Sequence, residues 1–426
     1  MAIHVDSEIG QLERVLVHRP GQEIDWMVPT MMEELLFDDI LYGGKARAEH
    51  DSFCEILRRG GAEVLEAEKL LAEVVVEQDI RNEILDNLSD DGELRPETRD
   101  RLEELEPADL AAALISGLRN EAGYQSTETH LYDLAPAPNY FFQRDPQFVA
   151  NHRVFLSSMA TRARSREPRL AQAILQAHPA LSGYRSLFAI GRDPLGSGFP
   201  VSGSAANLEG GDVLVVNAET LLVGVSERTN FRGVERLAEF LRCEETAFNR
   251  MIVVDLPRRR SYMHLDTVFT LIDRGVALAF LPVIEPGRRL SAEVFSVDLG
   301  ARELSFSLRR SLVDALSEAG VDIELVPCGG VIDVLDQARE QWTDGANAFA
   351  LAPGIMLLYR RNRLTVEELP RRGWRIVEQE EILSGRREVF GHGRTVVTIP
   401  GNELSRARGG PRCMTMPLER RPLGAG

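Results

Sequence analysis

Four short β-hairpins recur along this chain, and their repetition limits the possible folds more than any other feature of the sequence. Each hairpin consists of two apolar runs that flank a few polar or turn-forming residues, such as Asn151-His152-Arg153 or Pro353-Gly354. The hairpins span residues 148–156, 213–225, 268–280 and 348–359. Their spacing is too irregular for a solenoid of identical repeats, and it indicates related units with loops of different length.

Most of these hairpins are followed by a helical pattern and then by a strand. The helical stretch at 232–242, for example, leads to a strand at 251–255. The N-terminal segment 15–65 is typical of a strand, a helix and a strand, but it has no hairpin of its own. The apolar strand that begins at Thr395, followed by the loop of Cys413, could complete this first unit.

A ring of five such units, closed by the two ends of the chain, would leave few exposed strand edges. We therefore predict an α/β fold, specifically a five-bladed, pseudosymmetric α/β propeller over residues 1–66 and 122–426. Residues 67–121 are rich in acidic residues and leucine, which predicts a small inserted helical domain. An ordinary open α/β sheet remains the alternative, because periodicity alone does not distinguish the two.

A segment with ionisable or amide side chains stands just before each hairpin. If the units are equivalent, these segments lie at the same end of each unit and their side chains meet in one place. Cys413 would reach the same place from the closing unit. The four segments are residues 139–146, 207–212, 263–266 and 344–347. The candidate site is therefore Cys413, His264, Asp145, Asp266 and Glu209.

The chemistry of this set is coherent. A cysteine beside a histidine can perform nucleophilic catalysis, and several additional carboxylates are more than a cysteine protease needs. Carboxylates bind planar cations such as a guanidinium through charge-assisted hydrogen bonds. The thiol could be ionised in advance by Arg408 and Arg412, or it could ionise only when a cationic substrate arrives. Each residue also has an ordinary structural role open to it, and only their coincidence at matching positions favours a site.

Composition excludes several classes of function. The formal net charge is -17, which argues against nucleic acid as a partner and is compatible with a cationic small substrate. The four cysteines are far apart and no CxxC or His-rich cluster occurs, so we expect neither a metal site nor a disulfide framework. No signal-peptide core or run of ~20 apolar residues is present, so we expect a cytoplasmic protein without a membrane partner.

Six motifs together make the chain resemble bacterial arginine deiminases, which belong to the guanidino-group-modifying superfamily and have the pentein fold. The last two motifs are the most specific of the six. The motifs are Glu-Leu-Leu-Phe-Asp-Asp at 34–39, Phe-Gln-Arg-Asp-Pro at 142–146, Glu-Gly-Gly-Asp at 209–212, Ser-Glu-Arg-Thr at 226–229, Met-His-Leu-Asp-Thr at 263–267 and Gly-Gly-Pro-Arg-Cys-Met at 409–414.

The resemblance implies hydrolysis of free L-arginine by water to L-citrulline and ammonia, without a cofactor, through a covalent thiouronium intermediate. Cys413 would be the nucleophile, and His264 would be the general acid and base. Asp145 and Asp266 would bind the guanidinium nitrogens. Glu209 would hydrogen-bond His264 and complete the anionic cage.

The resemblance also assigns the residues that bind the rest of the substrate. Arg164 and Arg228 would hold its carboxylate, with Asn139 near its α-amino group. Members of this family associate as dimers or larger assemblies, so we expect a homo-oligomer. The residues expected to close over the bound ligand are Leu36, Phe142 and Arg408.

Two alternative functions remain open. A related enzyme of the superfamily would act on another guanidino substrate, for example agmatine, which has no carboxylate and would leave Arg164 and Arg228 without a role. A non-catalytic pentein protein would bind a partner instead. The presence of Cys413, His264 and all three carboxylates argues against that second alternative.

Overall fold

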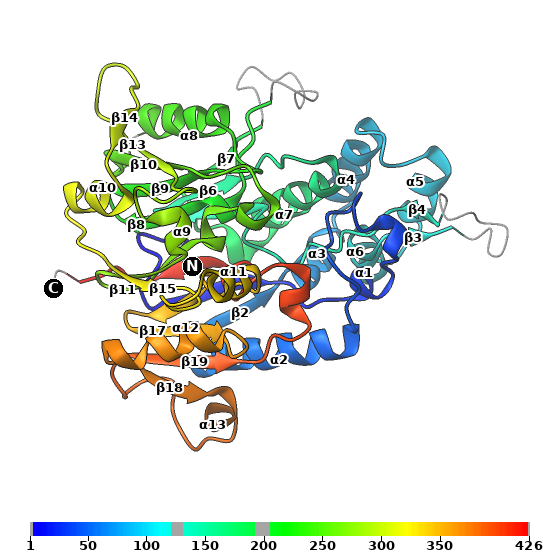
Figure 1. The fold of residues 1–426 in the computed structure, drawn as a ribbon. Coiled ribbons are helices and arrows are strands. Elements are labelled where there is room, and N and C mark those ends of the chain that lie inside the picture. The colour runs from blue at the N-terminus through cyan, green and yellow to red at the C-terminus, as the bar shows by residue number, and fades with distance from the viewer. Residues whose placement is uncertain (1–2, 121–130, 192–204, 245, 425–426) are drawn as a thin grey trace.

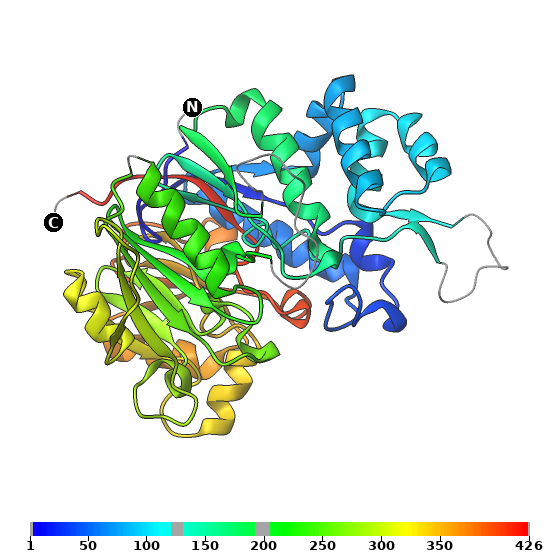
Figure 2. The ribbon, with the colours of Figure 1, turned by 90° about the horizontal axis from the view of Figure 1, so that it is seen from above.

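The computed structural model of this chain describes residues 3–120, 131–191, 205–244 and 246–424. Small mixed sheets and the helices that connect their strands make up most of these residues (Figures 1 and 2). In four units an antiparallel hairpin is extended by a third strand, which follows a helix and pairs in parallel with the hairpin. In a fifth, the antiparallel pair is formed by strands from the two ends of the chain. The predicted succession of hairpin, helix and strand is therefore confirmed.

Three of the units lie in the middle of the chain. The first consists of β5 (Gln147–Ala150), β6 (Arg153–Leu156), α7 (Arg166–Ala177) and β7 (Ser186–Ala189). The second consists of β8 (Val213–Asn217), β9 (Thr220–Val225), α8 (Phe231–Cys243) and β10 (Arg250–Asp255), extended by β13 (Glu293–Asp298) and β14 (Ser307–Arg309). The third consists of β11 (Phe269–Asp273), β12 (Val276–Ala279), α10 (Leu312–Glu318) and β15 (Glu324–Pro327), with α9 (Leu281–Ile284) after β12.

The other two units involve the C-terminal part of the chain. The fourth consists of β16 (Phe349–Ala352), β17 (Ile355–Tyr359), α12 (Arg363–Glu368), β18 (Arg375–Glu378), α13 (Gln379–Leu383) and β19 (Thr395–Ile399), with α11 (Val334–Trp342) before it. The fifth joins both ends of the chain and consists of β20 (Met416–Arg420), β1 (Leu12–Val17), α1 (Gln22–Asp25), α2 (Gly43–Arg59) and β2 (Glu63–Glu66).

The strand that begins at Thr395 does not complete the N-terminal unit, contrary to the expectation from sequence. It is β19, which lies between β17 and β18 and pairs in parallel with both. All five of its residues are buried, and a strand that is buried on both faces is typical of the interior of a sheet rather than of its edge. The N-terminal unit is completed by the next strand, β20, which pairs with β1 in antiparallel fashion.

Four helices follow β2 and gather at one side of the molecule (Figures 1 and 2). Their apolar side chains, including Leu71, Leu85 and Leu114, share one core with Leu170 and Ile174 of α7. The helices are α3 (Ala67–Val74), α4 (Gln78–Asp90), α5 (Pro96–Glu103) and α6 (Pro107–Ser116), and β3 (Leu118–Arg119) pairs with β4 (Tyr132–Leu134) where the chain returns. None of the helices in the described ranges is long and apolar enough to cross a bilayer.

The segments before the four hairpins and the segment before β20 are linked to one another by hydrogen bonds. The links run from each unit to the next and return to the first, so these segments surround one point. In order, Gly210 N donates to Asp145 O (2.9 Å), Leu265 N to Asp212 Oδ1 (2.8 Å), Asn347 Nδ2 to Asp266 O (3.1 Å), Arg412 N to Asn347 Oδ1 (3.0 Å) and Arg144 N to Cys413 O (3.0 Å).

A buried ion network lies beside these links. The side chain of Arg412 is almost fully buried, and its Nε and Nη2 each donate to Glu8 at 3.1 Å while its Nη1 donates to Asp266 Oδ2 at 2.8 Å. Burial by itself would raise the pKa of Glu8, but Arg412 and Arg144 outweigh it and lower that pKa to about 2. The network is therefore charged, and it joins the N-terminal segment, the third unit and the closing loop.

We predict that Arg412→Met destabilises the fold by about 3–5 kcal/mol, because Glu8 and Asp266 would lose a buried partner. Arg19→Met is the matched control, since Arg19 and Asp51 form an ion pair of which each side chain is about half exposed. It should cost less than about 1 kcal/mol. Chemical unfolding followed by circular dichroism measures both, and an equal loss would show that burial adds nothing to the Arg412 network.

Candidate active site

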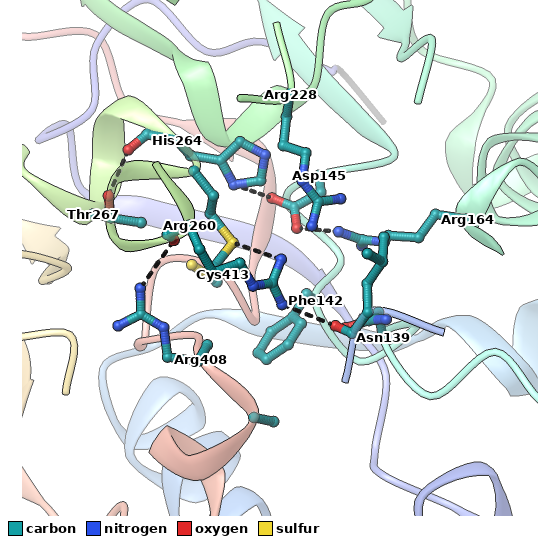
Figure 3. A pocket seen from close by; sticks show the side chains of 13 residues that line it. Asn139, Phe142, Asp145, Arg164, Arg228, Arg260, His264, Thr267, Arg408 and Cys413 are labelled. Atoms are coloured by element: carbon teal, nitrogen blue, oxygen red, sulfur yellow. Dashed lines mark hydrogen bonds and ion pairs between the residues drawn. The ribbon is translucent and has the colours of Figure 1, made fainter. Parts of the chain in front are cut away.

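The predicted site residues converge on one enclosed pocket. Figure 3 shows His264, Asp145 and Cys413 around it, with Arg164 and Arg228 on the Asp145 side. The predicted residues in its lining are Cys413, His264, Asp145, Asn139, Phe142, Arg164, Arg228, Leu36 and Arg408. The remaining two, Glu209 and Asp266, are fully buried behind the lining, where they contact His264 and Cys413.

His264 is held between two carboxylates. Its Nε2 lies 2.8 Å from Glu209 Oε2, and its Nδ1 lies 3.6 Å from Asp145 Oδ1. Burial lowers the pKa of His264, but the carboxylates of Asp145, Glu209 and Asp212 outweigh burial and raise that pKa to about 9. Burial likewise raises the pKa of Glu209, but the hydrogen bond to His264 and the charge of Arg228 lower it to about 2. His264 is therefore a cation at neutral pH and can donate a proton.

The Glu-Gly-Gly-Asp motif makes this close packing possible. A β-carbon on Gly211 would stand 2.6 Å from Nδ1 of His264 and 2.9 Å from Oδ1 of Asp145. Any side chain at this position would therefore push the imidazole and the carboxylate apart. The motif combines a residue without a side chain, Gly211, with the carboxylate of Glu209 two residues earlier, which explains why these residue types occur together.

The Cys413 thiol is surrounded by negative charge. Its Sγ lies 3.7 Å from Asp266 Oδ2 and 3.2 Å from Asn347 Nδ2. Burial, followed by the carboxylates of Asp266, Asp145 and Asp344, raises the pKa of this thiol well above its usual range. Of the two possibilities left open by the sequence, the structure thus favours a neutral thiol that ionises when a cation arrives.

Asp145 and Asp266 each have one oxygen that accepts a hydrogen bond from an arginine and one that accepts no hydrogen bond from the described residues, although that oxygen of Asp145 lies 3.6 Å from Nδ1 of His264. Asp145 Oδ2 accepts from Arg164 Nη1 at 2.7 Å, and Asp266 Oδ2 accepts from Arg412 Nη1 at 2.8 Å. The other oxygen of each is buried and has no hydrogen-bond partner within the described ranges. An unpaired buried acceptor costs about 1–3 kcal/mol, so a ligand with N–H donors would relieve both.

The two arginines predicted to bind a carboxylate differ in their hydrogen-bond partners. Nη1 of Arg228 is buried and lacks a hydrogen-bond partner in the part of the chain that is described. Arg164, in contrast, donates from Nη1 to Asp145 and from Nε and Nη2 to Glu167, at 2.9 and 2.7 Å. Arg228 therefore has a donor ready for a ligand, whereas the guanidinium of Arg164 orients Asp145.

The pocket is closed. Its free volume is about 20 Å³, which is room for about one water molecule. The guanidinium of Arg408 lies 3.6 Å over the ring of Trp342 and donates to the carbonyl oxygen of that residue. Both Leu36 and Arg408 have left-handed backbone conformations, with φ of 56° and 68°, which is unfavourable for such side chains. A ligand larger than a water molecule can therefore reach Cys413 only after these closing residues move.

The structure also adds residues that were not predicted. Arg260 lines the pocket, where its Nη2 donates to Leu36 O at 3.1 Å and to Asp38 Oδ2 at 2.6 Å. No motif singles out Arg260. Asn347, in contrast, lies in a segment that the hairpin pattern already indicated, although the pattern assigns it no role. Glu167 follows the predicted Arg164 by one helical turn, a spacing that allows an ion pair.

Asp145, Glu209 and His264 could also be considered as metal ligands, because one ligand atom from each lies within 4.8 Å of the others. A histidine binds a metal ion only as the neutral imidazole, however, and the pKa of His264 is raised to about 9. The cations Arg164 and Arg228 also stand within 4.0 Å of these carboxylates. The set therefore suits an organic cation with N–H donors better than a metal ion.

Comparison with known proteins agrees with this geometry. The family model described as Arginine deiminase matches residues 33–420. A protein named arginine deiminase from Bacillus thuringiensis subsp. konkukian (strain 97-27) is 36% identical over 440 residues, and the match covers 99% of this chain and 99% of that protein. Another protein of that name, from Listeria monocytogenes serotype 4b (strain CLIP80459), is 36% identical over 437 residues, and the match covers 99% of this chain and 98% of that protein.

Among solved structures, SxtG, an amidinotransferase from Microseira wollei, has the same fold. Its TM-score is 0.56 at 14% identity, and the match covers 100% of this chain and 99% of that one. An identity this low shows the fold alone. The matches to the family model and to the two relatives, in contrast, extend over nearly the whole sequence, and the range matched by the family model covers the positions of all six motifs. The chain therefore belongs to the arginine deiminase family.

Proposed function

We propose that this chain hydrolyses free L-arginine to L-citrulline and ammonia through a covalent adduct on Cys413. The relatives named arginine deiminase support the reaction. The observation that carries the proposal is the pair of buried carboxylate oxygens on Asp145 and Asp266 that accept no hydrogen bond, combined with Nη1 of Arg228, which donates none within the described residues. These atoms are complementary to the two ends of arginine, a guanidinium and a carboxylate.

The first half of the reaction forms the adduct. The guanidinium donates to Asp145 and Asp266, and its positive charge lowers the pKa of the Cys413 thiol, which loses its proton to water. The thiolate attacks the guanidinium carbon and gives a tetrahedral adduct. His264 donates its proton to one nitrogen, the C–N bond breaks, and ammonia leaves with the electron pair. The product of this half is a thiouronium group on Cys413.

The second half consumes water. His264 is now neutral and takes a proton from a water molecule, whose oxygen attacks the thiouronium carbon. The C–S bond of the second tetrahedral adduct then breaks, and its electron pair returns to the sulfur of Cys413. The proton of the new hydroxyl group passes to this sulfur as the carbonyl of citrulline forms. Citrulline is released and His264 is again protonated. Arginine and water are thus converted to citrulline and ammonia without an added cofactor.

The remaining pocket residues would bind the amino-acid end of arginine. Arg228 and Arg164 would hold the carboxylate, with Asn139 near the α-amino group. Asn139 Nδ2 already donates to Leu35 O at 2.8 Å, which connects it to the neighbouring closing residue. The residues that would close over the ligand are Leu36, Phe142 and Arg408.

The fold that brings these residues together is also a proposal. We propose a five-bladed pseudosymmetric α/β propeller over residues 1–66 and 122–426, with residues 67–121 as an inserted helical domain. The closed series of hydrogen bonds between the pre-hairpin segments supports the propeller. The proposed boundary at 121–122 lies outside the described residues. A cytoplasmic location is supported by the need to keep the Cys413 thiol reduced.

We also propose that the protein forms a homo-oligomer through α11 and the residues just before it. Four large apolar side chains are exposed there, Ile332 by 96%, and such a cluster is unusual on a monomer. Asp336 and Arg339 on α11 have no ion-pair partner in the described part of the chain. Two copies of α11 in antiparallel contact would place Asp336 opposite the partner's Arg339. The exposed apolar residues are Val331, Ile332, Val334 and Leu335.

We predict that Ile332→Glu raises the dissociation constant of this assembly by more than about 100-fold, because the interface would bury an unpaired carboxylate. Leu308→Glu is the control, since Leu308 is 63% exposed on β14, away from α11. Analytical ultracentrifugation measures the association of each variant. A wild-type protein that is monomeric at micromolar concentration, or an unchanged Ile332→Glu variant, would contradict the proposed interface.

We predict that Cys413→Ser abolishes citrulline formation while arginine still binds, because the carboxylates and Arg228 remain. A colorimetric citrulline assay and isothermal titration calorimetry measure the two properties separately. Cys243→Ser is the matched control, since Cys243 is exposed and lies on α8, outside the pocket lining. Citrulline formation by Cys413→Ser near the wild-type rate would exclude Cys413 as the nucleophile.

We predict that Arg228→Ala weakens arginine binding by about 2–5 kcal/mol, which is ~30-fold or more in KM. Agmatine distinguishes the alternative substrates, because it has a guanidinium but no carboxylate. Its inhibition constant should change much less in the same variant. If agmatine and arginine were affected equally, or if arginine kinetics were unchanged, Arg228 would not be the carboxylate-binding residue and the alternative guanidino substrate would be favoured.

A further inference from the structure

Asn347 contacts the sulfur of Cys413 directly. It precedes β16 in the fourth unit, and its side chain is fully buried. Its Nδ2 lies 3.2 Å from Sγ, within the range for a hydrogen bond to sulfur. None of the comparisons with known proteins and none of the motifs gives this side chain a role in the reaction, although it touches the atom that would attack the substrate.

The orientation of the Asn347 amide is determined by its other hydrogen bonds. Its Oδ1 accepts from the backbone N–H of Arg412 at 3.0 Å and of Cys413 at 3.4 Å, and its Nδ2 donates to the carbonyl of Asp266 at 3.1 Å. The reversed orientation would place an NH2 group against two N–H donors and an oxygen against a carbonyl. The second hydrogen of Nδ2 is therefore available to the sulfur.

This donor counteracts the surroundings of the thiol. Burial and three neighbouring carboxylates, Asp266, Asp145 and Asp344, disfavour a thiolate. The cations of His264 and Arg408 line the same pocket, but they do not outweigh these effects in the free enzyme. A lysine or arginine in place of Asn347 would stabilise the thiolate but would also repel the guanidinium of the substrate. A neutral amide stabilises the negative sulfur without adding a charge. The backbone leaves room for it, because a β-carbon on Gly410 would stand 2.5 Å from Asn347 Oδ1.

We propose that Asn347 is a further catalytic residue, whose side-chain N–H stabilises the Cys413 thiolate both when it attacks the guanidinium carbon and when it leaves the second adduct. This inference rests on the proposed role of Cys413 as nucleophile. The amide is not consumed or protonated in the reaction, and its contribution is one charge-assisted hydrogen bond to sulfur. Such a bond corresponds to about 10- to 100-fold in rate.

Asn347→Asp tests the proposal, because it keeps the shape of the side chain and an oxygen for the two backbone N–H groups but removes the amide donor. We expect kcat/KM for arginine to fall by about 10- to 100-fold or more. We also expect alkylation of Cys413 by iodoacetamide in the free enzyme to require higher pH, since the thiolate loses a donor and its pKa rises. Mass spectrometry of the Cys413 peptide follows the alkylation rate against pH.

Two further variants complete the experiment. Asn347→Ala removes the donor without adding a carboxylate, and its alkylation profile should shift in the same direction. Thr270→Val is the structural control, because Thr270 Oγ1 donates to Ala346 O at 2.6 Å and supports the same turn without contacting the sulfur. It should lower the midpoint of thermal unfolding and leave the alkylation profile unchanged.

The outcomes separate this inference from the proposed function. If the alkylation profiles of Asn347→Asp and Asn347→Ala match the wild type, the inference is wrong even where activity falls, since the residue then acts only on structure. A profile shift in Thr270→Val equal to that of Asn347→Ala would also overturn it. If instead Cys413→Ser still forms citrulline, the proposed function fails first, whatever the Asn347 variants show.

Discussion

The buried ion network centred on Arg412 is the interaction on which the rest of this structure depends. Arg412 donates to Glu8 near the N-terminus and to Asp266 in the third unit, and its backbone N–H donates to Asn347 in the fourth. Cys413 is the next residue along the chain. Isolated buried charges are very costly, so the network is stable only when all these segments are assembled. The nucleophile is thus placed by the same contacts that join the ends of the chain.

The electrostatics of the site follow from this arrangement. Arg412 neutralises one oxygen of Asp266, and Arg164 neutralises one oxygen of Asp145, but the other two oxygens remain unpaired in the interior. The carboxylate of Asp145 raises the pKa of both His264 and the Cys413 thiol, and that of Asp266 raises the pKa of the thiol, in addition to burial. The free enzyme therefore holds an imidazolium beside a neutral thiol. A cationic substrate relieves the unpaired oxygens and favours the thiolate, which links reactivity to the presence of the correct ligand.

Besides ionisation of the Cys413 thiol, the reaction requires that the closed pocket open to admit the substrate. The free volume of about 20 Å³ excludes arginine until the segments of Leu36 and Arg408 move. Arg408 stacks on Trp342 at the end of α11, so the closing residue is in contact with the helix that we propose as the oligomer interface. Left-handed backbone conformations at Leu36 and Arg408 cost free energy in the closed state, and this makes the two segments suited to a change of conformation.

The hairpins and most of the site residues can be predicted from the sequence, because they depend on residue types that are close together in the chain. Apolar runs around turn residues determine the hairpins, and the polar segments before them carry His264, Asp145 and Glu209. The order of strands within a sheet, in contrast, cannot be predicted from local sequence. The strand at Thr395 joins the fourth unit, since a strand that is buried throughout needs a neighbour on each side, and no local pattern states which neighbours are available.

The sequence by itself determined which residue types meet at the ends of the units, and therefore a thiol, a histidine and carboxylates suited to a guanidinium. Only the tertiary structure decided how they are partnered. Arg164 is engaged by Asp145 and Glu167, whereas Arg228 keeps a free donor. The amide of Asn347 faces the sulfur. Such pairings depend on distances of a few ångströms between residues far apart in the chain, and hydrogen bonds and ion pairs are effective only at that range.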